Sequence, residues 1–175
     1  MHAPGKLVHQ PGFRFAFVFT VCLLIGFGVL FSPAVQFVDQ AISRGLVGIA
    51  WDLIRLFGGH ASREAAILRA PGGFAVEMRD GCNAVNVTLL LWSAVLAFPS
   101  SWRPKLLGIV GGALIIQVVN LFRFITLFYL GQFSTSWFDF AHSYLWESLI
   151  ILDTLVVFWF WVTRFARSGG ARVRA

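Results

Sequence analysis

Long runs of apolar residues, each close to the length needed to cross a bilayer, dominate the chain. A transmembrane helix needs about 20 predominantly apolar residues to cross roughly 30 Å of hydrocarbon. Four runs qualify, at residues 13–31, 82–98, 106–130 and 144–162. The second reaches full length only if the stretch from Cys82 is included. The pattern predicts an all-α integral membrane protein with about four transmembrane helices, and residues 1–175 are expected to form a single membrane-embedded domain.

The segment between the first two runs, residues 32–81, has a different pattern. Residues 35–57 place three charged side chains on one side of a helix and apolar side chains elsewhere, which is typical of an amphipathic helix lying on the outer leaflet. As a fifth span, this helix would bury four charges. Two short runs, 65–70 and 74–79, flank Pro71-Gly72-Gly73 and predict a small β-hairpin that leads directly to Gly81-Cys82.

Composition supports the membrane assignment and excludes a water-soluble enzyme. The 175 residues are 58% hydrophobic and 13% charged, against roughly 45–50% apolar and about 25% charged in a soluble domain. So few polar groups could not cover a core that contains 19 Phe and 7 Trp. Residues 13–31 are expected to remain as an uncleaved span, because the run is long for the apolar core of a signal peptide.

The positive charges predict the orientation. Eight Lys and Arg side chains flank the spans at the N-terminus, in the 99–105 loop and in the C-terminal tail, with no acidic residue among them. Residues 32–82 instead have five Arg and five acidic residues. Positive loops stay in the cytoplasm, so both termini are expected there, in a multi-pass protein of the bacterial inner (plasma) membrane. The net charge of +6 is then a bias toward anionic membrane lipids, and nucleic-acid binding is the weaker interpretation.

This topology brings three chemically reactive side chains to the outer membrane face. Cys82 lies at the outer mouth of the second span, and His142 lies at the outer start of the fourth. Arg123 lies about seven residues, or roughly 10 Å, below the outer end of the third span, and its long side chain can rise toward the interface. A thiol, a guanidinium and an imidazole therefore come from three consecutive helices.

Each of these residues also has a purely structural interpretation. An isolated Cys is most often a small buried hydrophobe, although Cys82 follows a charged turn on the oxidising side and lies too far from Cys22 to pair with it. His142 fits an interfacial histidine equally well. As a base beside a thiol, it would have Asp139 three residues earlier to orient its ring.

Arg123 is the most informative of the three, because a charge inside a span costs at least about 2.5–3.5 kcal/mol. It should face the protein interior and have a partner or a function. One alternative is an ion pair with Glu147 or Asp153 in the fourth span. The other is that it faces the thiol and stabilises an oxyanion during acyl transfer. Asn120, at i−3 on the same face, either donates to that site or joins helices.

Metal and cofactor sites are not expected. The other histidines, His2, His9 and His60, form no pair at ligand spacing with one another or with a Cys. No Gly-rich phosphate loop is present, and Gly111-Gly112 in the third run favours close helix packing instead.

The chain resembles the exosortase/archaeosortase family, and most closely the short exosortase H type. The resemblance covers most of the chain from the outer segment to the fourth span. It is carried by GFAV at 73–76, GCNAV at 81–85, AFP at 97–99, NLFR at 120–123, LFYLG at 127–131, and AH and LW at 141–142 and 145–146. After the cysteine, Asn83-Ala84 replaces the commoner Ser-Gly of the family.

The resemblance implies a membrane-embedded cysteine transpeptidase or endopeptidase. Such enzymes are thought to recognise a C-terminal signal made of a short motif, a transmembrane helix and a basic tail, and to pass the cleaved protein to a surface acceptor, which is unknown here. By analogy, Cys82 is the nucleophile, His142 the acid/base and Arg123 the transition-state stabiliser. The non-enzymatic alternative is a membrane scaffold or assembly subunit with a structural buried Arg123. A transporter is disfavoured by the shortage of broken helices.

Overall fold

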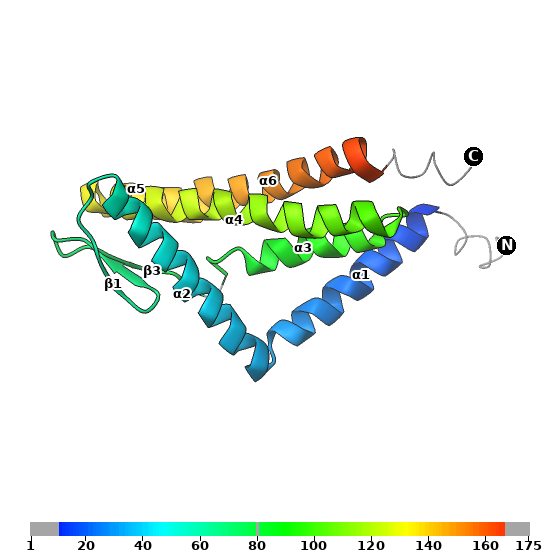
Figure 1. Ribbon diagram of the computed structural model, residues 1–175, viewed down its shortest axis with the longest axis horizontal. Helices are drawn as coiled ribbons and strands as arrows, with labels where there is room; N and C mark the ends of the chain where they lie inside the picture. The colour runs from blue at the N-terminus through cyan, green and yellow to red at the C-terminus, as the bar shows by residue number, and fades with distance from the viewer. Residues whose placement is uncertain (1–10, 80, 167–175) are drawn as a thin grey trace.

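The computed structural model describes residues 11–79 and 81–166. Its helices in chain order are α1 (Pro11–Leu30), α2 (Pro33–Leu56), α3 (Val85–Ala97), α4 (Trp102–Phe133), α5 (Thr135–Phe140) and α6 (Trp146–Trp161). Two π-helical turns, η2 (Ala141–Leu145) and η3 (Val162–Ala166), join α5 to α6 and extend α6. In Figure 1, α3, α4 and α6 run side by side, while α1 and α2 form a V beside them.

Among the residues that the structure describes, three helices are long and apolar enough to cross a membrane: Gly12–Leu30, Trp102–Phe133 and Thr135–Ala166. The predicted helical membrane fold is therefore confirmed. The predicted span at 82–98 needs correction, because α3 has only 13 residues and measures about 20 Å at 1.5 Å per residue. Gly81 at φ 88° and Ala84 at φ 60° hold the preceding turn in the left-handed region, where an α-helix cannot continue.

The short helix α3 packs tightly against its neighbours. Leu91 and Val95 of α3 belong to one buried cluster with Ile116 of α4 and Trp161 of α6. A Cβ atom at Gly112 would collide with Leu91, whereas one at Gly111 would meet no atom within 4 Å. Of the predicted glycine pair, only Gly112 therefore permits close helix packing, in the manner of small residues in membrane helices.

The segment between α1 and α3 forms a helix and a small sheet, as the sequence predicts, with one strand more than expected. The strands β1 (Ser62–Glu64), β2 (Ile67–Arg69) and β3 (Ala75–Glu77) pair antiparallel in the order β1-β2-β3. β2 and β3 are the predicted hairpin, closed by Pro71-Gly72-Gly73 with Gly73 at φ 91°. β1 was not predicted, because its three residues are all polar and exposed.

A second buried cluster joins α2, the sheet and α4. Val47 and Ile54 of α2, Leu68 and Val76 of the sheet, and Phe128 of α4 are all buried in it. The helix predicted at 35–57 thus packs part of its apolar surface against protein, while Phe37, Ile49 and Leu56 are exposed. Figure 1 shows α2 running obliquely toward the end of α4 that carries the sheet.

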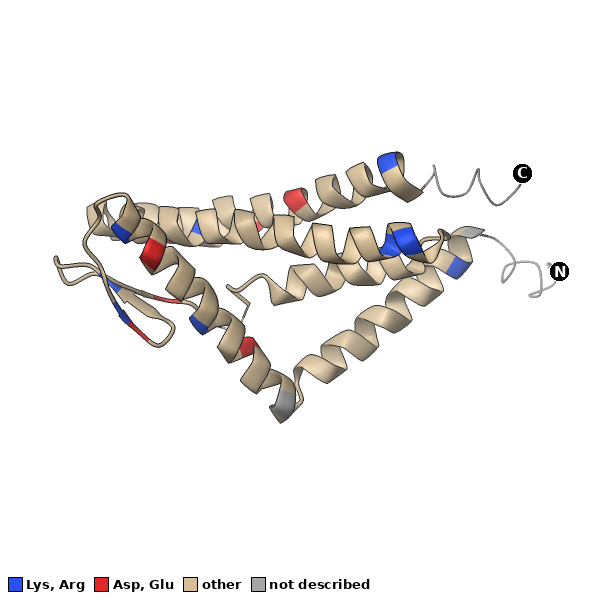
Figure 2. Ribbon diagram, viewed as in Figure 1, with Lys and Arg blue, Asp and Glu red and all other residues tan. Residues whose placement is uncertain are grey.

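Charged side chains divide between the two ends of the molecule (Figure 2). The end where α4 begins and α6 finishes carries only Lys and Arg among the described residues. The opposite end, with α2 and the sheet, carries both signs. Of the eight cations counted in the sequence, Lys6 and the Arg residues of the tail beyond residue 166 lie outside the described part of the chain.

The fourth predicted span also begins earlier than expected. The continuous helix starts at Thr135 rather than near residue 144, because Ser134 provides an N-cap whose side chain accepts a hydrogen bond from the Trp137 N–H. His142 therefore lies inside a helix, one residue into the π-helical turn η2. π-helical turns within α-helices occur often at functional sites.

Candidate active site

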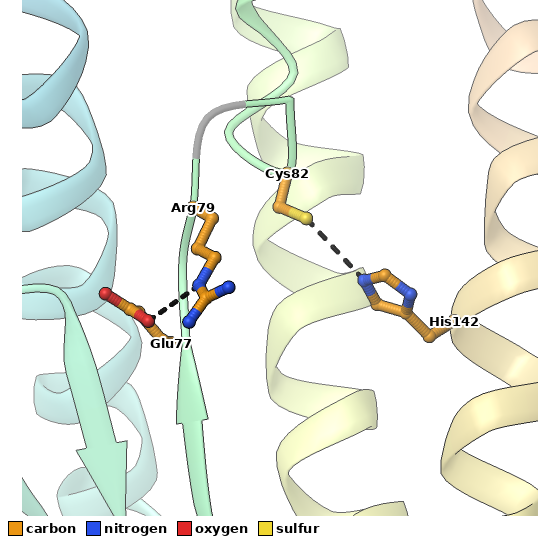
Figure 3. Close-up of polar contacts among 4 residues, drawn as sticks. All are labelled: Glu77, Arg79, Cys82 and His142. Carbon is orange, nitrogen blue, oxygen red and sulfur yellow. Dashed lines mark hydrogen bonds and ion pairs between the residues drawn. The ribbon is translucent and has the colours of Figure 1, made fainter.

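The turn between β3 and α3 presents Cys82, which is partly exposed, toward His142 of η2 (Figure 3). Gly81 and Ala84 on either side have positive φ, which reverses the chain between the strand and the helix. Ala84 occupies the position where the family more commonly has glycine, and it adopts the left-handed conformation that glycine favours. The Asn83-Ala84 departure is thus compatible with a tight turn.

Asn83, the residue after the cysteine, fixes this turn to three helices. It is fully buried. Its Nδ2 donates hydrogen bonds to Asp39 Oδ1 at 2.7 Å and Ser43 Oγ at 3.1 Å, both on α2. Its Oδ1 accepts from the Val85 N–H at the start of α3, and its carbonyl accepts from Gln117 Nε2 of α4, both at 3.1 Å. The network defines the position of the Cys82 backbone, and the sequence analysis missed it.

Cys82 and His142 lie close together and line one cavity. The Cys82 Sγ and the His142 Nε2 lie 3.6 Å apart, which is hydrogen-bond distance for sulfur. The two residues are separated by 60 positions in the sequence. The imidazole also stacks on Phe138, one helical turn earlier, with ring centroids 5.7 Å apart and planes inclined by 21°. The predicted proximity of thiol and imidazole is present in the fold.

Asp139 does not orient the histidine ring in this arrangement. It is exposed, and it forms no hydrogen bond or ion pair within the described chain. Although the helix does begin before Asp139, as the sequence argument required, the ring is held by Phe138 and Cys82. The π-helical turn changes the angle between successive residues around the helix axis. The expectation that residues three positions apart share one side assumes a regular α-helix.

Arg123 projects from α4 into the same cavity. It is 5% exposed, and within 11–79 and 81–166 it has no ion pair and no hydrogen-bond partner. In particular, neither Glu147 nor Asp153 pairs with it, so the structural alternative lacks its expected contact. Asn120, one turn before Arg123, is fully buried, and both its amide nitrogen and its amide oxygen lack hydrogen-bond partners. Buried polar groups of this kind are unusual and costly.

These side chains line one cavity of about 460 Å³. Its remaining walls come from the sheet and from the apolar side chains of α4 and α5. Three further charged residues in the lining were missed by the sequence analysis: Arg69, Glu77 and Arg79. The position of Arg79, three residues before Cys82, is the sequence feature that could have identified it as a residue of the site.

Arg79 and Glu77 form an ion pair beside the thiol (Figure 3), with Arg79 Nε 2.8 Å from Glu77 Oε2. This hydrogen bond and the charge of Glu77 raise the pKa of Arg79 above its ordinary value, and the nearby Cys82 adds to the same effect. Arg79 is therefore a fixed cation within electrostatic range of the sulfur. Asp80, which follows it, lies outside the described residues.

Together, these groups provide the parts needed for nucleophilic attack on a carbonyl. A thiol lies at hydrogen-bond distance from a base, and a buried guanidinium and an unpaired amide open into the same space as potential donors to an oxyanion. The β3–α3 turn and α4 contribute to the two buried clusters, and Ala141 of η2 is buried. Acyl transfer is thus the chemistry that the arrangement suits best.

Substituting Asn83 by alanine is expected to weaken the site and the fold together. The change leaves the Gln117 contact to the backbone intact but removes the donor to Asp39 Oδ1 and Ser43 Oγ and the side-chain acceptor of the Val85 N–H. Leaving buried polar groups unpaired costs about 1–3 kcal/mol. Thermal unfolding in detergent should show a lower midpoint for Asn83→Ala than for Asn86→Ala, a matched control at an exposed position in the next turn. Equal midpoints would contradict this role.

Comparison with known proteins identifies a family for the chain. The family model of the transmembrane exosortase (Exosortase_EpsH) matches residues 7–161, which include Cys82, Arg123 and His142. No curated protein matches the chain, and no solved structure matches it. Because the family model covers most of the sequence, from before α1 to the end of α6, the chain belongs to the transmembrane exosortase family.

Proposed function

We propose that the protein is a membrane cysteine endopeptidase and transpeptidase. It cleaves the C-terminal sorting signals of exported proteins and transfers the upstream protein to a surface acceptor. The observation that carries this proposal is the 3.6 Å contact between Cys82 Sγ and His142 Nε2, in a cavity that also contains the unpaired guanidinium of Arg123. A scaffold subunit would need neither the contact nor the unpaired charge.

The reaction proceeds in two steps. His142 takes the proton of the Cys82 thiol, and the thiolate attacks the carbonyl carbon of the scissile peptide bond. Arg123 donates hydrogen bonds to the resulting oxyanion, and Asn120 Nδ2 is a second donor. The C–N bond then breaks, the leaving amine takes a proton from His142, and a thioester joins Cys82 to the upstream protein. An amine of the acceptor or a water molecule, deprotonated by His142, releases that protein and restores the thiol.

The orientation expected from the sequence fits this substrate. With the purely basic end of the bundle in the cytoplasm, the cavity faces the outside of the inner membrane. A substrate anchored by its own C-terminal helix, with its basic tail in the cytoplasm, then presents its scissile bond near the outer interface. Confinement of both proteins to the same membrane raises their effective concentration.

A covalent intermediate tests the proposal. Cells expressing the wild-type protein should contain an adduct between the chain and the upstream part of a substrate, and hydroxylamine should release it because thioesters are cleaved by strong amine nucleophiles. The adduct is expected to be missing in Cys82→Ala and reduced in His142→Ala. Immunoblots before and after hydroxylamine measure it. An adduct that persists in Cys82→Ala would overturn the assignment of the nucleophile.

A further inference from the structure

Strand β3 is an edge strand, and its free edge carries unpaired backbone groups. It pairs with β2 on one side only. The hydrogen bonds from the Ala70 N–H to the Phe74 carbonyl and from the Met78 N–H to the Ala66 carbonyl continue the β2–β3 ladder on both sides. In an antiparallel ladder the hydrogen-bonded pairs alternate with pairs whose backbone groups point outward. The N–H and C=O groups of Ala75 and Glu77 therefore point away from β2.

The active-site cavity lies against β3, the strand with this free edge. Its lining includes Ala75 and Glu77 of β3 together with Arg69 and Ile67, their partners on β2, on one face of the sheet. It also includes Val76, whose side chain lies on the other face, so the cavity covers one face of the hairpin and reaches β3. On the opposite side, the cavity is bounded by His142 of η2 and Arg123 of α4.

The two ends of the β3 edge are defined by the fold. At its start, Phe74 packs edge-on against Phe138, with ring centroids 5.6 Å apart, and against Gly131 of α4. At its other end the chain turns into the loop that presents Cys82 (Figure 3). An extended chain lying along β3 would therefore pass between the strand and His142 and reach the thiol.

Charge in the cavity favours a particular kind of chain. Arg69 and Arg79 in its lining are paired with Glu64 and Glu77, at 3.3 and 2.8 Å. Arg123 is the lining cation that has no ion-pair partner within residues 11–79 and 81–166. The excess of positive charge disfavours a segment with Lys or Arg side chains in contact with the cavity. The free backbone groups of β3 suit an extended peptide, and the positive charge of the cavity suits one that is neutral or acidic.

We propose that the peptide substrate binds as a fourth strand on the free edge of β3, with main-chain hydrogen bonds to Ala75 and Glu77, so that its scissile bond lies beside the Cys82–His142 pair. This inference rests on the proposed peptidase function. When a peptide binds as an added strand, main-chain hydrogen bonds provide affinity. Every second side chain of the peptide contacts the protein and provides specificity. Recognition of this kind also uses an edge that would otherwise be open to unwanted pairing.

Proline at residue 75 tests the proposal in the full-length protein in its membrane. Ala75→Pro removes one outward N–H and leaves the β2–β3 ladder intact, since proline is tolerated on edge strands where its nitrogen faces outward. The probe is a reporter protein carrying the C-terminal segment of a protein that accumulates uncleaved in Cys82→Ala cells. Processing of this reporter should slow by about 2–13-fold, as expected for the loss of one main-chain hydrogen bond in a binding step.

Two control variants separate this effect from misfolding and from bulk. Arg63→Pro places proline on the other edge of the sheet, where the β1–β2 register also points the residue's N–H outward but away from the cavity, and it should process the reporter at the wild-type rate. Ala75→Val adds similar bulk while keeping the N–H, and it should process faster than Ala75→Pro. Alkylation of Cys82 by N-ethylmaleimide at the wild-type rate shows that the site of Ala75→Pro is folded.

The outcomes distinguish this inference from the function on which it rests. Normal processing by Ala75→Pro, in a strain where Cys82→Ala is inactive, overturns strand addition and leaves the peptidase intact. Equal slowing by Ala75→Pro and Arg63→Pro also overturns it, because the effect then comes from the sheet as a whole. If no protein accumulates in Cys82→Ala cells, the proposed function itself fails.

Discussion

Replacing Cys82 with alanine is expected to abolish cleavage of the substrate while leaving the protein folded in the membrane. No other described thiol lies near the cavity, because the only other cysteine is Cys22, on α1. Removing the nucleophile of a covalent mechanism leaves only the contribution of binding and of the oxyanion donors, so the rate should fall by at least about 10³-fold. The ratio of uncleaved to cleaved substrate on immunoblots measures the loss.

Cys22→Ala is the matched control for this variant. Both cysteines are partly exposed, but Cys22 does not line the cavity with His142, so its removal should leave cleavage unchanged. Unfolding midpoints of the two variants close to that of the wild type would show that neither change disrupts the fold. Cleavage at the wild-type rate in Cys82→Ala would favour a scaffold role for the protein.

Replacing Arg123 with lysine is expected to cause the second-largest loss, although the charge is kept. A guanidinium offers several donors in a fixed plane, whereas an ammonium is a compact point charge on a flexible stem. Arg123 has no ion-pair partner in the described chain that a lysine could satisfy equally well. Loss of one oxyanion donor typically costs about 10²–10³ in rate, and cleavage should fall by that factor while Cys82 remains open to alkylation.

Arg103→Lys is the control for the chemical change itself. Arg103 is exposed at the opposite end of α4, where a charge near the membrane surface is sufficient. Its substitution should leave cleavage unaffected. If Arg123→Lys also retains most of the wild-type rate, the arginine serves the fold through its charge alone, and the oxyanion role is wrong.

Many features of the fold followed from local pattern. Apolar runs of spanning length determine α1, α4 and the long helix that includes α6, because backbone hydrogen bonds must be satisfied within each segment in lipid. The Pro-Gly-Gly turn determines the β2–β3 hairpin in the same local way. Since helices of this length must run across the membrane, their order along the chain was enough to bring Cys82, Arg123 and His142 to one end of the molecule.

The tertiary structure decided the features that depend on contacts between distant residues. α3 begins at Val85 rather than at Cys82 because Asn83 finds partners on α2, some 40 positions earlier. His142 is oriented by Phe138 rather than Asp139, since a π-helical turn changes the angular spacing along its helix. In the described part of the chain Arg123 has no ion-pair partner, although Glu147 and Asp153 lie on the next membrane helix.

The sequence by itself therefore determined which elements form and which reactive side chains share one end of the bundle. Both depend on hydrophobic periodicity and on the thickness of the membrane. Only the tertiary structure decided which groups touch and which polar groups stay open to a ligand, namely Arg123, Asn120 and the free edge of β3. Which polar groups stay open to a ligand depends on how the elements pack against one another. Packing between residues far apart in the sequence leaves no hydrophobic periodicity by which one sequence could predict it.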